Sequence, residues 1–111
     1  MNINYLSIMA LLVLPCVGAN AAADPAILEI RFENHRFTPQ SLTVPAGAPL
    51  EIKVTNASGE RIEFESFKLN REKVVEPGAS VIVRLPALRA GTYDFFDDFH
   101  ADVPEGAIVA K

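Results

Sequence analysis

Sulfur is almost absent from this chain. Of its 111 residues, one is cysteine, Cys16, and two are methionine, Met1 and Met9. Residues 17–111 therefore contain no thiol, so they have no disulfide to stabilise them and must depend on a single hydrophobic core. The same absence excludes a cysteine nucleophile and a thiolate metal ligand from that part of the chain.

Long apolar runs are also absent. The run at residues 8–17 is too short for a membrane-spanning helix, which needs about 20 residues. The small residues of "GANAAAD" follow it before the first charge, Asp24, and this is the pattern of a secretory signal peptide, although residues 1–9 lack the usual Lys or Arg. We expect residues 1–23 to be a signal peptide cleaved after Ala23, with Ala21 as the alternative. Residues 24–111 would then form one exported domain that does not insert into the membrane.

Positive charge is scarce as well, since 10 Lys and Arg stand against 14 Asp and Glu, for a net charge of −4. A mildly acidic chain has no electrostatic basis for binding nucleic acid or anionic lipid. The imbalance is sharpest between Arg89 and Lys111, where no other Lys or Arg occurs. The acids of this segment are Asp94, Asp97, Asp98, Asp102 and Glu105. Such a local excess of negative charge attracts cations.

Motifs of several enzyme classes are missing too. The sequence has no G-x-S-x-G, no glycine-rich phosphate loop and no H-E-x-x-H. Paired carboxylates could serve a glycosidase, but a chain of this length leaves little room for a sugar cleft. We therefore do not expect a glycosidase.

Alternation of apolar and polar residues is the main pattern that the sequence contains. It predicts strands around residues 28–33, 50–55, 61–65 and 80–85, with further strands at 41–44, 72–75, 92–96 and 107–110. Turn-forming stretches rich in Pro, Gly and Asn separate them, at 45–49, 56–60, 76–79 and 89–91. Short strands at such regular intervals are typical of an antiparallel sandwich or a small barrel.

Two stretches carry residues that could bind a metal. Asp97, Asp98 and His100 lie between phenylalanines in "FFDDFH", where neither a buried strand nor an ordinary turn needs them. Glu63 and Glu65 are two positions apart on a predicted strand, so both side chains leave the same face, about 6.6 Å apart along it. The two carboxylates could converge on one ion or on two neighbouring ions.

The order of the motifs resembles that of the cupredoxins, the β-sandwich fold of small copper proteins. The similarity covers about residues 27–111 and is most specific in P-x-x-L-x-V-x-x-G at Pro39–Gly47 and in P-G…P-x-x-x-x-G-T-Y at Pro77–Tyr93. It implies an all-β, antiparallel Greek-key sandwich of about seven to eight strands with a metal site at one end. Residues 24–111 would form this domain.

The departures from the cupredoxin pattern concern the metal ligands. Asp97 stands at the family's cysteine position, whereas His100 keeps the histidine three residues later. No methionine is present near residues 104–105, and Glu63 or Glu65 stands where the first histidine is expected. A type 1 blue-copper centre needs a thiolate, so we do not expect one here.

A narrower group resembles the chain at these substituted positions. The cupredoxin-like components of bacterial ferrous-iron uptake systems, the Ftr-type component and the Efe-type N-terminal domain, carry the equivalent of Glu63-Phe64-Glu65, then "VVEPG" and G-x-Y-D. Because position 97 is not cysteine, the Ftr-type component is the closer likeness. The resemblance implies a periplasmic protein that binds Fe(II), with or without Cu(II), and passes it to an iron permease or another periplasmic iron-uptake component.

The resemblance places both acidic stretches at the same end of the sandwich and brings in a second histidine. The expected ligands are oxygen and imidazole donors: Glu63, Glu65, Asp97, Asp98, His100 and His35. Such donors suit Fe(II), Fe(III), Mn(II) or Cu(II) and disfavour Cu(I). Carboxylates also stabilise Fe(III) over Fe(II), so an accessory ferroxidase activity is conceivable and stays open.

Each of these residues also has an ordinary structural interpretation. The two glutamates could form the solvated face of a strand, and Asp97 with Asp98 could form an Asx turn. His35 could be a surface residue, and the acidic segment a solvated loop. Two other functions therefore stay open: a Cu(II) carrier without redox turnover, and a cupredoxin-shaped interaction module whose metal end is not used.

Overall fold

The computed structural model describes residues 13–15 and 25–111, and the predicted signal peptide lies almost wholly outside them. Within the described part the chain forms only strands, and no helix there is long and apolar enough to cross a membrane. The strands are β1 (Ala26–Glu33), β2 (Arg36–Thr38), β3 (Ser41–Val44), β4 (Leu50–Asn56), β5 (Ile62–Ser66), β6 (Arg71–Val75), β7 (Ser80–Leu85), β8 (Gly91–Asp97) and β9 (Gly106–Ala110).

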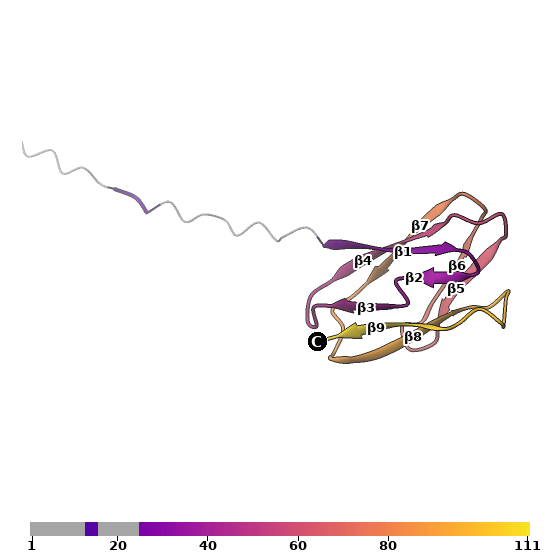
Figure 1. The fold of residues 1–111 in the computed structure, drawn as a ribbon. Helices are drawn as coiled ribbons and strands as arrows, with labels where there is room; N and C mark the ends of the chain where they lie inside the picture. The colour runs from indigo at the N-terminus through magenta and orange to yellow at the C-terminus, as the bar shows by residue number, and fades with distance from the viewer. Residues whose placement is uncertain (1–12, 16–24) are drawn as a thin grey trace, which may run out of the picture.

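Two sheets form a sandwich (Figure 1), as the sequence predicted. One sheet has the strand order β2-β1-β4-β7 and the other β3-β9-β8-β5-β6. The alternation seen in the sequence becomes alternation of burial; in β4 every second side chain from Leu50 to Asn56 is buried. These inward positions from both sheets make one continuous core.

The strand count and the strand directions differ from the prediction. Residues 25–111 form nine strands instead of seven or eight, because Arg36–Thr38 returns along β1 as the short strand β2. The sheets are mixed, since β1 pairs with β4 in parallel and β3 pairs with β9 in parallel. The chain crosses to the other sheet between the members of each parallel pair, and alternation of residue types carries no information on strand direction.

Aromatic packing supports the end of the sandwich that holds His35 and His100. Phe37 packs edge-on against Phe32 and Phe95, with ring centroids 5.2 Å and 5.1 Å apart, and Phe95 lies 5.0 Å from Phe64. All four rings are buried. Burying each such ring contributes about 1.5–3 kcal/mol to the stability of the fold. This part of the core therefore supports the β1–β2 turn, which carries His35, and the β8–β9 loop, which carries His100.

Gly106 is required for packing at the start of β9. A Cβ atom there would overlap the ring of Phe95 and lie 2.8 Å from the backbone oxygen of Gln40. Neither neighbour can move away, because Phe95 is fully buried in the core.

We therefore expect Gly106→Ala to lower the free energy of unfolding by about 1–3 kcal/mol, the usual cost of overpacking. Urea unfolding followed by circular dichroism measures this change. Gly59→Ala is the matched control, since a Cβ there meets no atom within 4 Å. Equal stability of the two variants would contradict this description of the core.

Candidate metal centre

Strands β5 and β8 bring the two acidic stretches of the sequence together. They pair antiparallel, with Phe64 opposite Asp97 and Glu65 opposite Phe96. Residues paired across two strands share a face of the sheet, so Asp97 lies on the face of Phe64, whereas Glu63 and Glu65 lie on the other. The structure therefore divides the predicted ligands between two groups of side chains.

We call the first group the tip cluster; its members are His35, Glu60, Asp97, His100 and Asp102. It forms where the β1–β2 turn meets the β8–β9 loop, at one end of the sandwich (Figure 1). We call the second group the carboxylate cluster; its members are Glu63, Glu65 and Glu72. Glu60 and Glu72 did not emerge as ligand candidates from the sequence.

Asp97 organises the tip cluster. Only 2% of this residue is exposed, and its Oδ1 accepts hydrogen bonds from the backbone N–H groups of Glu63 and Phe99, each at 3.0 Å. The bond from Phe99, two residues on, is that of an Asx turn. Its Oδ2 lies 2.6 Å from Nδ1 of His100. Both oxygens of Asp97 therefore have hydrogen-bond partners.

His100 is thereby fixed in orientation. Because the Asp97 carboxylate accepts, Nδ1 of His100 donates, and Nε2 is left facing Oε2 of Glu60 at 3.6 Å. The hydrogen bond to Asp97 raises the pKa of His100, and the negative charges of Asp97, Glu60 and Asp102 add to this, while burial opposes it. The imidazole is therefore held by one nitrogen and open at the other.

His35 reaches the same place from the β1–β2 turn. This is a two-residue hairpin turn, with positive φ angles at Asn34 (53°) and His35 (59°), as in the type I′ turn that matches strand twist. Nε2 of His35 lies 2.8 Å from Oδ2 of Asp102, and this hydrogen bond lowers the pKa of Asp102. Nδ1 of His35 faces Oε2 of Glu60 at 3.8 Å.

The two histidines are thus arranged alike around one carboxylate oxygen. Each imidazole has one nitrogen held by an aspartate, and its other nitrogen is directed at Oε2 of Glu60. The rings lie edge to face with centroids 5.9 Å apart. Carboxylates that hold the far nitrogen of a histidine are the usual outer partners of metal-binding imidazoles.

Glu60 is positioned by a buried asparagine. Asn56 is fully buried, and its Nδ2 donates to the backbone oxygen atoms of Glu60, at 2.6 Å, and Val75, at 3.0 Å. Its Oδ1 accepts from the backbone N–H and the hydroxyl of Ser58. In sequence Glu60 looked like part of an ordinary turn, and nothing there indicated that its side chain faces two histidines.

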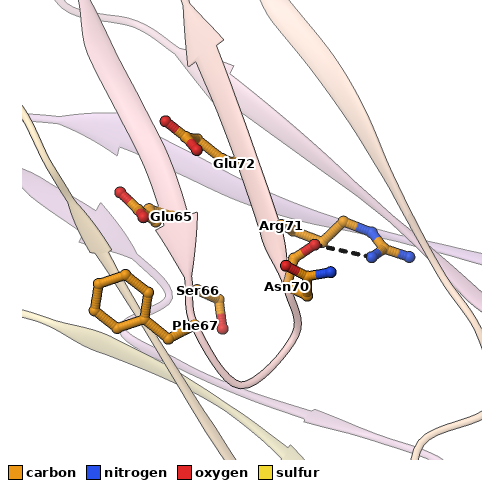
Figure 2. Close-up of a pocket in the computed structure, with 6 residues that line it drawn as sticks. All are labelled: Glu65, Ser66, Phe67, Asn70, Arg71 and Glu72. Atoms are coloured by element: carbon orange, nitrogen blue, oxygen red, sulfur yellow. Dashed lines mark hydrogen bonds between the residues drawn. The ribbon is translucent and has the colours of Figure 1, made fainter.

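The carboxylate cluster lies on the β5–β6 hairpin. Each of its glutamates offers one carboxylate oxygen, and the three atoms lie within 4.8 Å of one another. Glu65 is directly opposite Glu72 in the antiparallel register. Figure 2 shows these two side chains projecting from neighbouring strands on the same side of the hairpin. A four-residue turn at 67–70 fixes this register, and that spacing could have revealed Glu72 in the sequence.

Glu63 is the buried member of the carboxylate cluster. A hydrogen bond with Glu72, burial, and the negative charges of Glu72, Asp98 and Glu65 raise the pKa of Glu63 to about 7. Burial, together with the charges of Asp98 and Glu72, also raises the pKa of Glu65. Asp98 itself is exposed, so it acts on this cluster as a nearby charge.

Comparison with known proteins agrees with the fold. A family model described as a cupredoxin-like domain matches residues 6–110. An uncharacterized protein of Rickettsia prowazekii (strain Madrid E) is 38% identical over 87 residues, which cover 77% of this chain and 70% of that protein.

Solved structures with a similar fold include copper proteins. Reduced auracyanin from Roseiflexus castenholzii has a TM-score of 0.65 at 16% identity, over 80% of this chain and 99% of that one. The metal binding domain of the Streptococcus pneumoniae D39 Cu(I)-exporting P-type ATPase CopA, solved with Cu(I), has a TM-score of 0.65 at 16% identity. The match covers 82% of this chain and 92% of that domain. At these identities the similarity establishes the fold alone.

We expect Asp97→Asn to lower the pKa of His100. The amide can still accept from the two backbone N–H groups, but it no longer offers the imidazolium a negative partner. Nuclear magnetic resonance titration of the imidazole, with a chelator present, measures the change. Asp98→Asn is the matched control and should leave the pKa of His100 nearly unchanged; an unchanged value in Asp97→Asn would contradict the assigned hydrogen bond.

A second prediction concerns pH and Glu63. The pKa of Glu63 in the folded chain, about 7, lies above its ordinary value of 4.5, so the folded state binds this proton more tightly than the unfolded state does. Proton binding by Glu63 therefore stabilises the fold at low pH, and this stabilisation is lost as the pH rises from 4.5 to about 7. Glu63→Gln cannot lose a proton. With a chelator present, its free energy of unfolding relative to the native chain should therefore rise with pH, as urea unfolding at several pH values would show. If the free energies of unfolding of Glu63→Gln and of the native chain changed with pH in the same way, the prediction would be wrong. Glu29→Gln, at an exposed position, is the control and should follow the native chain at every pH.

Proposed function

The chain belongs to the cupredoxin-like domain family, and on that premise we propose that it binds a divalent transition-metal ion, Fe(II) or Cu(II), at the tip cluster. The observation that carries the proposal is the arrangement of His35, His100 and Glu60, in which two open imidazole nitrogens face one carboxylate oxygen. Two imidazoles with one carboxylate are a frequent ligand set for Fe(II).

A single ion would have to draw the ligand atoms of the tip cluster closer together. Two atoms bound to one ion with bonds of about 2.0–2.2 Å lie roughly 3.0–3.4 Å apart. The nitrogens of His100 and His35 lie 3.6 Å and 3.8 Å from Glu60 Oε2, so both side chains would have to move inward to reach binding distance. Asp97 and Asp102 would hold the imidazoles in place from behind rather than bind the ion themselves.

The donor set argues against a type 1 copper centre. Such a centre needs a thiolate, and the side chain at the family's cysteine position is Asp97, whose oxygens already accept three hydrogen bonds. The nitrogen and oxygen donors of the tip cluster would favour Cu(II) over Cu(I). The family's fold is therefore kept with different metal chemistry.

We place the protein in ferrous-iron uptake, in the periplasm, with an iron permease or another uptake component as the receiver of the ion. This role rests on the Glu63-Phe64-Glu65 and "VVEPG" motifs of the sequence and on the expected signal peptide. Carboxylates near the ion would favour Fe(III) over Fe(II), so oxidation could be assisted when an electron acceptor such as Cu(II) or oxygen is present.

A Cu(II) carrier without redox turnover is the second candidate. The pair of imidazoles supports it, because nitrogen donors bind Cu(II) more tightly than Fe(II). Loss of Fe(II) in air, followed with and without added copper, separates the two candidates. A protein that binds Cu(II) and leaves Fe(II) oxidation unchanged would be the carrier.

Anaerobic calorimetric titration with Fe(II) and with Cu(II) tests metal binding itself. We expect His35→Ala and Glu60→Gln each to weaken binding by at least tenfold, because each removes a ligand. Glu29→Gln, an exposed carboxylate outside both clusters, should bind like the native chain. Native affinity for both ions in both ligand variants would refute the tip site.

A further inference from the structure

A second group of potential ligands lies on the outer face of the β5–β6 hairpin, apart from the tip cluster. We propose that Glu63, Glu65 and Glu72 form a separate metal site for a hard, oxygen-preferring cation, divalent or trivalent, of the class of Mn(II) and Fe(III). This site goes beyond the proposed function, because it shares no side chain with the tip cluster.

Backbone geometry brings the three carboxylates together. Glu63 and Glu65 project from the same face of β5, and Glu72 stands directly opposite Glu65 on β6. One oxygen from each lies within 4.8 Å of the others. Glu65 and Glu72 also line an open pocket (Figure 2), so a hydrated ion can approach from solvent.

Glu63 supplies an independent reason to infer a ligand. This residue is only 7% exposed, and its Oε1 is buried without any hydrogen-bond partner. A buried polar atom with no partner is destabilising, and native proteins leave few of them. A bound cation would give this oxygen the partner it lacks.

None of the described residues forms an ion pair with Glu63, Glu65 or Glu72. Arg71 lines the same pocket, but its side chain points away from the glutamates (Figure 2) and donates to the backbone oxygens of Leu69, Asn70 and Arg84. Arg61 pairs with Glu76 instead. The charge of exposed Asp98 adds to that of the three glutamates.

The chemistry of the two sites differs enough to separate them. The carboxylate cluster offers only oxygen atoms, which suit hard cations and bind Cu(I) poorly. The tip cluster adds two imidazoles. One hydrogen bond links the two clusters, from the backbone N–H of Glu63 to Oδ1 of Asp97. The carboxylate of Glu63 takes no part in it.

Titration of the full chain with Mn(II), followed by electron paramagnetic resonance of the free ion, tests the proposal. We expect Glu72→Gln to weaken Mn(II) binding at this site at least tenfold, since it removes a ligand at an exposed position where folding is not at risk. Glu65→Gln should do the same. Glu29→Gln is the matched control and should bind Mn(II) as the native chain does.

Two further variants keep the result interpretable. Glu63→Gln should raise the thermal stability of the metal-free protein and abolish the extra stability that Mn(II) confers. His35→Ala removes the tip site and should leave the Glu72-dependent Mn(II) binding unchanged, so the two proposals can fail separately. Native Mn(II) affinity in Glu72→Gln and Glu65→Gln, equal loss in Glu29→Gln, or loss of the Glu72-dependent Mn(II) binding in His35→Ala would each overturn the second site.

Discussion

The buried carboxylate of Asp97 is the group on which the tip of the molecule depends. It accepts from the backbone N–H of Glu63 in β5 and from Phe99 and His100 in its own loop, so β5 and the β8–β9 loop are joined at one side chain. An ionised group out of water is costly unless it is paired and hydrogen-bonded, and here both oxygens are engaged. This carboxylate fixes the shape of the loop and the direction of the His100 imidazole.

Alternation along β5 then creates two different electrostatic environments a few ångströms apart. Phe64 points into the core with Asp97, whereas Glu63 and Glu65 point outward with Glu72. A histidine beside buried Asp97 is favoured in its charged form, and a glutamate beside other glutamates is favoured in its neutral form. The sheet thus separates a cluster of nitrogen and oxygen donors from a cluster of oxygen donors alone.

Residue patterning predicted most of the fold but only part of the site. Strict alternation was sufficient for eight strands, and it placed Glu63 and Glu65 on one face. It could not reveal β2, which is too short to alternate, or the parallel pairs, which depend on how the chain crosses between sheets. Glu72 needed the hairpin register and Glu60 needed the hydrogen bonds of Asn56. The split of the predicted ligands into two clusters likewise required knowing which face Asp97 occupies.

The turn that carries His35 has an implication for how such a chain can evolve. Two consecutive residues with left-handed backbone angles favour Asn followed by Gly, because a side chain at the second position is strained there. Glycine at position 35 would relieve the backbone strain of this hairpin turn, but it would also remove the imidazole. At this one residue, a relaxed backbone and a side chain that faces Glu60 and Asp102 therefore require different amino acids.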